Sequence, residues 1–113
     1  MVSIETVRKL ALSFPETDEH PHFHLKAFRV KKKIFCTLHE KDNRVMVKLS
    51  QVEQSVFCAF DNSVIYPVPG VWGKKGATFI ELGKIKKIMF KDALTVAYCN
   101  TAPAKLAEQC RNN

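Results

Sequence analysis

The sequence lacks a long apolar segment. No run of about 18 apolar residues occurs, and a membrane-spanning helix needs a run of roughly that length. Residues 1–5 lead directly into an amphipathic pattern, without the apolar stretch of a secretory signal peptide. We therefore expect a cytoplasmic protein.

Paired metal-ligating and catalytic motifs are also missing. There is no GxSxG turn, no phosphate-binding loop and no GxGxxG after a strand. Cys36 and His39 would lie on opposite faces of a strand, which makes them a poor nucleophile and base pair. We expect no enzymatic activity, no catalytic residue and no cofactor. Reduced thiols are favoured over a disulfide framework or a zinc site, because no CxxC pair joins any of Cys36, Cys58, Cys99 and Cys110.

Acidic residues are scarce relative to basic ones. The chain of 113 residues contains 18 Lys+Arg but only 11 Asp+Glu, which gives a net charge of +7. This balance favours acidic partners such as nucleic acid, and a basic surface that serves only solubility is the alternative. A hydrophobic content of 46% is typical of a globular chain, and we expect a single domain over residues 1–113.

The hydrophobic pattern predicts an α+β fold. Ser3 and Ser50 are expected helix caps, and Pro15 ends the first helix. Residues 16–25 are polar and histidine-rich, which indicates an irregular connection. We expect an antiparallel sheet of about five strands, covered by helices on one face, in the order α-βββ-α-ββ-α. The expected helices cover residues 4–14, 51–60, 84–99 and a short terminal segment through Cys110, and the expected strands cover residues 27–30, 34–38, 45–48, 64–66 and 77–82.

Two of these helices have an expected apolar face. In the second helix, Val52, Val56, Ala59 and Phe60 fall on one side. In the long helix, the inward arc is expected to contain Ile85, Ile88, Met89, Ala93 and Val96.

Residues 65–78 form the most informative segment. This segment contains Tyr66, the only tryptophan, two prolines, three glycines and a lysine pair. The prolines interrupt sheet pairing and the glycines permit close backbone approach. Large aromatic side chains dominate protein cores, so we favour Trp72 as a plug at the end of the sheet. Its other interpretation, which is compatible with the first, is a platform on which nucleic-acid bases stack.

Three motifs in combination resemble the MmcQ/YjbR-like family. They are the strand pair 27–38 (AFRV, then KIFCTL), the PVPGVWGKKGAT loop and the DALTVAY helix. The resemblance runs from the first helix to about Leu106 and implies a frataxin-like (CyaY-like) sheet that binds DNA as a "double wing". Ala77 occupies a position where relatives often carry a second aromatic, so a paired-aromatic role is not carried over.

The lysines fall into groups that fit contacts with phosphate. Our candidate nucleic-acid-binding residues are Lys31, Lys32, Lys33, Trp72, Lys74, Lys75, Lys87 and Lys91. We expect Lys84, Lys87 and Lys91 to share one helical face. The predicted function is DNA binding with low sequence specificity, by a chain expected to be monomeric. The alternative is a protein- or small-ligand-binding module that uses a groove between Tyr66 and Trp72.

The histidine segment is the one metal-like constellation. His20, His22 and His24 alternate, so an extended chain would turn them to one side. Pro21 and the expected irregular backbone oppose this, and we expect these histidines to bind no metal. Frataxin-like iron binding is also disfavoured, because the first helix carries Arg8 and Lys9 beside Glu5.

Overall fold

The first half of the chain forms a capped helix followed by an antiparallel meander. The computed structural model describes residues 1–111. Ser3 caps the first helix because its hydroxyl accepts a hydrogen bond from the Thr6 N–H at 3.1 Å. Short turns then join four consecutive strands, each antiparallel to the one before it. These elements are α1 (Ile4–Ser13), β1 (Thr17–His22), β2 (Leu25–Val30), β3 (Lys33–His39) and β4 (Arg44–Lys48).

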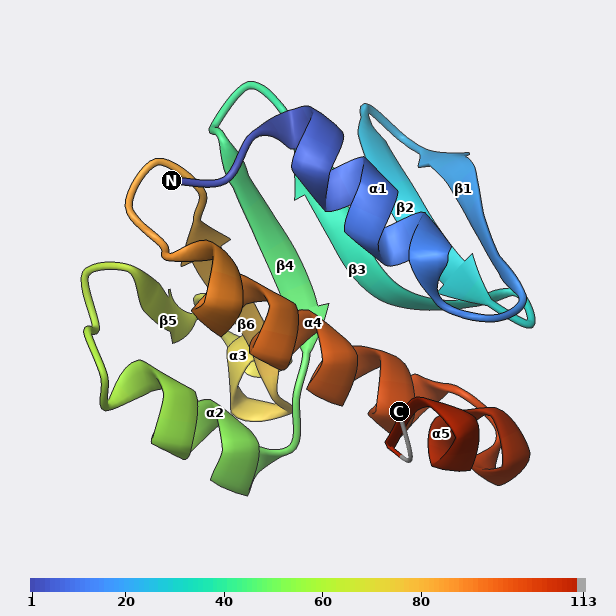
Figure 1. Cartoon of the computed structure of the whole chain (residues 1–113). Coiled ribbons are helices and arrows are strands. Elements are labelled where there is room, and N and C mark those ends of the chain that lie inside the picture. Colours follow the sequence, from blue (N-terminus) through green and yellow to red (C-terminus); the bar gives the residue numbers. More distant parts are fainter. Residues whose placement is uncertain (112–113) are drawn as a thin grey trace.

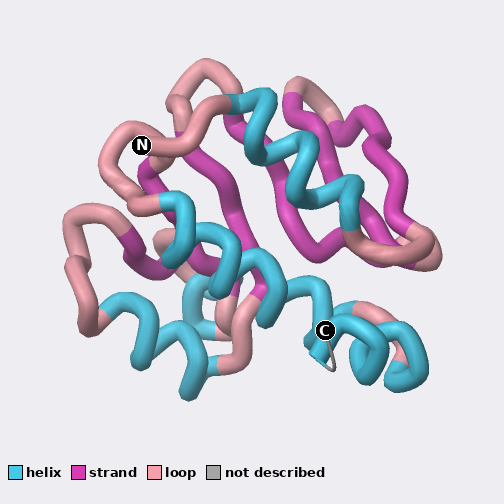
Figure 2. Tube along the Cα trace, viewed as in Figure 1, coloured by secondary structure: helices cyan, strands magenta, loops and turns pink. Residues whose placement is uncertain are grey.

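The second half places its last strand between β4 and the edge strand β5. Strand β6 pairs with both β4 and β5, so the six strands lie in the order β1-β2-β3-β4-β6-β5. Helices α1 and α4 cover one face of this sheet (Figures 1 and 2). No helix in residues 1–111 is long and apolar enough to cross a membrane. The elements are α2 (Gln51–Cys58), β5 (Ile65–Pro67), α3 (Val71–Lys74), β6 (Ala77–Glu81), α4 (Lys87–Thr101) and α5 (Ala104–Arg111).

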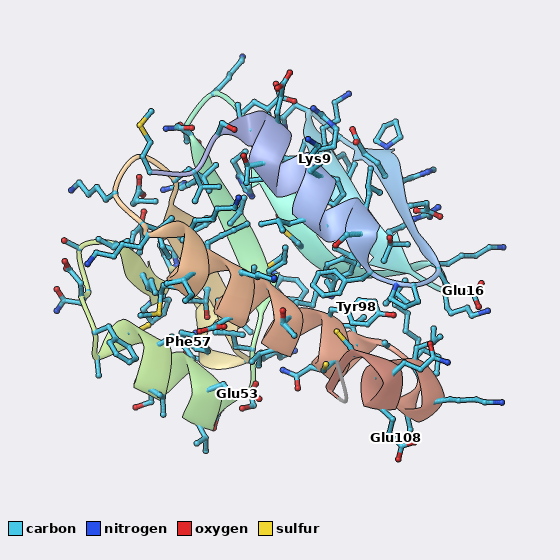
Figure 3. All side chains as sticks on the ribbon, in the orientation of Figure 1. Lys9, Glu16, Glu53, Phe57, Tyr98 and Glu108 are labelled. Atoms are coloured by element: carbon cyan, nitrogen blue, oxygen red, sulfur yellow. The ribbon has the colours of Figure 1, made fainter. Side chains whose placement is uncertain are left out.

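An aromatic cluster joins the helices to the sheet. The rings of Tyr98 on α4 and Phe14 after α1 stack with their centroids 4.6 Å apart. Phe35 on β3 meets Tyr98 edge-on at 5.5 Å. The Tyr98 hydroxyl donates to the Pro15 carbonyl at 2.8 Å, so this buried polar group is satisfied. Tyr98 thus ties α1, β3 and α4 together (Figure 3).

The prediction of an irregular connection over residues 16–25 is wrong, because residues 17–22 form strand β1. All six residues of β1 pair with β2. Polar side chains on this edge strand are held by ion pairs: Glu19 with Arg8 at 2.7 Å and Asp18 with Arg29 at 2.8 Å. The hydrogen bond from Arg29 lowers the pKa of Asp18. Pro21 is tolerated because one side of an edge strand needs no donor.

The additional strand corrects the expected order, which becomes α-ββββ-α-β-α-β-α-α. The α+β class and the antiparallel sheet are confirmed. The CyaY-like assignment stays a prediction. The expected caps at Ser3 and Ser50 are both present, the second as a full capping box with Glu53.

Helix α4 begins later than expected. The Lys84 and Ile85 N–H groups donate to the Glu81 carbonyl, so these residues form a turn before the helix. Lys84 therefore does not share a helical face with the later lysines. The expected inward arc is confirmed in part, because Ile85 and Ala93 are buried. Met89 and Val96 are half-buried and pack against the core, whereas Ile88 is 74% exposed. The buried residues of α4 are Phe90, Ala93, Leu94, Ala97 and Tyr98.

The expected apolar face of α2 points to solvent. Val52, Val56 and Phe60 are all exposed. The half-buried residues Gln54 and Phe57 lie on the other side of α2, and Phe57 packs against the core. The four cysteines are free thiols in the structure: Cys36, Cys58, Cys99 and Cys110.

Trp72 is not a core plug. Its side chain lies on the four-residue helix α3 and is 69% exposed. At this end of the sheet, backbone packs against backbone instead. A Cβ at Gly73 would lie 1.7 Å from the Val68 carbonyl oxygen, and a Cβ at Gly76 would lie 1.8 Å from the Leu49 carbonyl oxygen. These glycines allow close packing of the main chain at the position where we expected the Trp72 side chain to pack.

The close approach at Gly73 predicts a position-specific loss of stability. Gly73→Ala must displace α3 from Val68, and we expect it to lower the free energy of unfolding by about 3 kcal/mol or more. Gly83→Ala is the matched control, since its new Cβ would make only an ordinary contact with Asn43 at 3.6 Å. Urea denaturation of both variants measures the difference. Equal losses would show that the Gly73 contact does not constrain the loop.

The exposure of Trp72 predicts a small cost for its removal. Trp72→Ala removes only the minor buried part of the side chain, and we expect a loss of about 1–2 kcal/mol. Phe90→Ala empties a fully buried position and should cost about 3–5 kcal/mol. Urea denaturation again compares the two. If Trp72→Ala lowered the free energy of unfolding as much as Phe90→Ala does, Trp72 would have to be packed in the core.

Candidate functional site

The sheet face opposite α1 and α4 carries a second set of side chains. Side chains alternate along a strand, so the neighbours of each core residue point to this face. On β4, Val45 and Val47 are buried in the core. Met46 and Lys48 alternate with them and therefore lie on the opposite face of the sheet. The same alternation on β3 and β6 adds Thr37, His39, Ala77 and Phe79.

These side chains form the floor of a groove of about 380 Å³. Trp72 and Val68 line one side, and no acidic residue lines any part of it. A hollow of about 500 Å³ on the outer side of α1 is larger, but it is lined by residues of a single helix and its N-cap. An apolar groove with a few converging polar groups is the more typical binding site. The groove is lined by His22, Leu25, Ile34, Thr37, His39, Met46, Lys48, Val68, Trp72, Ala77 and Phe79.

Helix α2 anchors the backbone that carries Trp72. The Gln54 side-chain amide donates to the Gly73 carbonyl at 3.0 Å and to the Ala77 carbonyl at 3.1 Å. The Gln51 amide donates to the Lys74 carbonyl at 2.7 Å. The Gly73 and Lys74 carbonyls lie at the end of α3, a helix too short to be stable alone, and the Ala77 carbonyl lies at the start of β6. The Trp72 ring is therefore exposed, but the backbone that carries it is held in place by hydrogen bonds.

A polar cluster next to the groove supports its floor. The Arg44 guanidinium lies 3.8 Å from the centroid of the Phe79 ring and donates to the Tyr66 hydroxyl at 3.2 Å. Tyr66 in turn donates to the Glu81 carboxylate. Burial, then Glu81, raises the pKa of Tyr66, so its hydroxyl keeps its proton. Arg44 therefore packs on Phe79 from the same face of the sheet that carries the groove.

His39 is a neutral member of the groove. Burial, together with the nearby Arg44 charge, lowers the pKa of His39. Its Nε2 lies 3.0 Å from the Thr37 hydroxyl, and its ring meets Phe79 edge-on at 5.3 Å. The groove thus offers two uncharged hydrogen-bonding groups. Cys36 lies on the opposite, buried face of β3, where burial raises its pKa, so Cys36 and His39 form no nucleophile and base pair.

Two of the predicted lysine groups lie at one end of the sheet. Strand β2 ends at Val30, β3 begins at Lys33, β4 ends at Lys48 and β6 begins at Ala77, so the segments beyond these points share that end. Adjacent strands are about 4.8 Å apart, and two such steps separate β3 from β6 by roughly 10 Å. We call this region the basic end of the sheet, and it comprises Lys31, Lys32, Lys33, Lys48, Lys74 and Lys75.

The members of the basic end differ in their partners. Lys31 pairs with Glu16 at 2.9 Å, with both side chains about half exposed. The other five lysines have no ion pair among the described residues. The Lys75 ammonium lies 5.5 Å from the centroid of the Trp72 ring, which places a cation directly beside the aromatic surface.

Lys87 and Lys91 lie elsewhere. Helix α4 starts beyond the far end of β6 and covers the other face of the sheet (Figure 1). The structure therefore divides the predicted lysines into a main group at the basic end and a separate pair on α4.

One residue of the histidine segment lines the groove. His20 and His22 alternate on strand β1 and share a side, and His22 lines the groove. His24 lies in the turn after Phe23, whose φ is 57°. Residues 1–111 contain no group of three His, Cys, Asp or Glu side chains that could hold a metal ion.

Several groove residues escaped sequence reasoning. Thr37, Met46, Lys48 and Phe79 were predicted only as strand residues, and His39 was considered only as a possible base for Cys36. A signal was present in segment 45–48, where strict alternation assigns Met46 and Lys48 to the face away from the core. Segments 34–38 and 77–82 do not alternate strictly, because Phe35 and Cys36 are both buried, as are Thr78 and Phe79. The predicted groove between Tyr66 and Trp72 exists in part, since Trp72 lines it and Tyr66 lies beside it.

Comparisons with known proteins agree with this fold. The family model described as YjbR matches residues 12–100. The crystal structure of Deinococcus radiodurans protein DR2400, which contains a DUF419 domain, is similar with a TM-score of 0.78 and 16% sequence identity. That similarity covers 88% of this chain and 78% of the other. No protein in the curated set matches the sequence. The family match spans most of the chain, and the chain therefore belongs to the YjbR family.

Proposed function

We propose that the protein binds nucleic acid, with DNA as the first candidate, through the basic end of the sheet. The observation that supports this proposal is the placement of two lysine-bearing loops at the same end of the sheet. The groove on this sheet has no acidic lining among the described residues. The proposed role is binding rather than catalysis, and the chain is proposed to act as a monomer in the cytoplasm.

Phosphate contacts supply the binding free energy in this proposal. Each lysine that neutralises a phosphate releases condensed counterions, so affinity falls as salt rises. Such contacts position the nucleic acid without reading its sequence, which fits low specificity. Lys32, Lys33, Lys48, Lys74 and Lys75 are the primary contacts. Lys31 first has to leave Glu16, and such an exposed pair is worth little.

A second candidate function is the binding of a small ligand or a protein segment in the groove. The neutral His39 and the Thr37 hydroxyl favour it, since a few uncharged polar groups on an apolar floor are typical of small-molecule sites. Binding of that kind would depend weakly on salt. The lysines would then serve solubility alone.

The proposal predicts a steep and localised salt dependence. Engagement of four to six lysines gives a slope of log K against log salt between about −3.5 and −5.5. Replacing Lys74 and Lys75 with Ala should reduce the magnitude by up to about 2 and change sequence preference little. Fluorescence anisotropy of labelled DNA over a salt series measures both quantities.

The matched control replaces Lys87 and Lys91 with Ala. Both double variants lower the net charge from +7 by the same amount, and all four side chains are exposed. Both should also keep their free energy of unfolding within about 0.5 kcal/mol. An equal loss of slope in the two variants would show that binding follows net charge and not the basic end. Absence of any binding at low salt would refute the proposed function.

A further inference from the structure

We propose that the groove takes one unpaired nucleobase of a single strand, stacked against Trp72, while the basic end holds the flanking phosphates. The inference rests on the proposed function and extends it. It assigns the protein a preference for single-stranded over duplex nucleic acid.

The first support is the presentation of Trp72. The ring is 69% exposed, although its backbone is tied down by Gln51 and Gln54 from α2. A solvent-exposed aromatic side chain on a constrained backbone loses little conformational freedom when a flat ligand stacks on it. Every base has a π-face, so such stacking tolerates any sequence.

The second support is the composition of the groove. Phe79 and Met46 give an apolar floor, and Thr37 and the neutral His39 supply hydrogen-bonding groups on the same face. The edge of a base carries both donors and acceptors. A groove of about 380 Å³ with this lining suits a flat, partly polar ring better than a charged group.

The third support is the placement of charge. Lys48 lines the groove itself, and the Lys75 ammonium lies 5.5 Å from the Trp72 centroid. A base that stacks there brings its own phosphates toward these two cations. No carboxylate lines the groove to oppose them.

A base of a duplex cannot enter the groove unless the duplex is distorted. Its bases are already stacked on one another, and a base must leave the stack before it can reach Trp72. An unpaired strand has no such cost. Phosphate contacts at the basic end are open to both forms, but a duplex has the higher charge density. A single strand without bases is therefore the comparison that isolates the base-binding step.

The single tryptophan makes the test direct. Trp72 is the only tryptophan of the chain, so intrinsic fluorescence reports on the groove alone. Oligothymidine should quench it, whereas an abasic strand and a duplex of equal length should not at matched salt. We expect oligothymidine to bind about ten-fold more tightly than either. Quenching by oligouridine as well would support the same site for single strands of either sugar.

Variants separate the base site from the phosphate contacts. Trp72→Leu should remove the preference of labelled oligothymidine over the abasic strand in anisotropy, and Trp72→Phe should retain part of it. Phe60→Leu is the control, because Phe60 is a similarly exposed aromatic at 66% that does not line the groove. It should leave the preference unchanged.

The outcomes are distinguishable. Equal affinity for the three oligonucleotides without quenching would overturn the base site and leave phosphate binding in place. Absence of binding to all of them would overturn both proposals. Quenching by oligothymidine that persists in the Lys74 and Lys75 double variant, although its salt dependence is reduced, would support the base site as separate from these phosphate contacts.

Discussion

The close approach of Gly73 to the Val68 carbonyl is the constraint on which the exposed face depends. A side chain at that position would collide with main chain at 1.7 Å. Because only hydrogen fits there, α3 packs backbone to backbone against the end of the sheet. Its one large side chain, Trp72, is then left outside. Hydrogen bonds from Gln54 complete the arrangement. The same contact thus closes the fold and presents the aromatic ring.

The two faces of the sheet follow from one alternation. On the covered face, α1 and α4 pack over residues such as Tyr98, whose ring joins helix to strand. On the other face, Phe79 is covered by the Arg44 guanidinium and not by α1 or α4. That leaves a groove bounded by aromatic and apolar side chains. Antiparallel topology then places both lysine-bearing loops at one of its ends.

Sequence reasoning succeeded where local signals were strong. The capping box at Ser50, the stop at Pro15 and the family motifs all correspond to observed features. It failed at β1, because ion pairs and pairing with β2 stabilise a strand that has little apolar pattern. It also failed at Trp72, since composition cannot show that glycine backbone would fill the space. Convergence of distant lysines depends on strand order, which a sequence pattern does not contain.

Chemical-shift mapping tests the central claim most directly. A chain of 12.9 kDa is well suited to a titration of backbone amides with oligothymidine. The account predicts that the shifts concentrate in residues 31–37, at Lys48 and in residues 72–79, and that the Trp72 indole N–H moves with them. Amides around Lys87 and Lys91 should stay fixed. Shifts centred on the start of α4, or spread evenly over the basic surface, would contradict it.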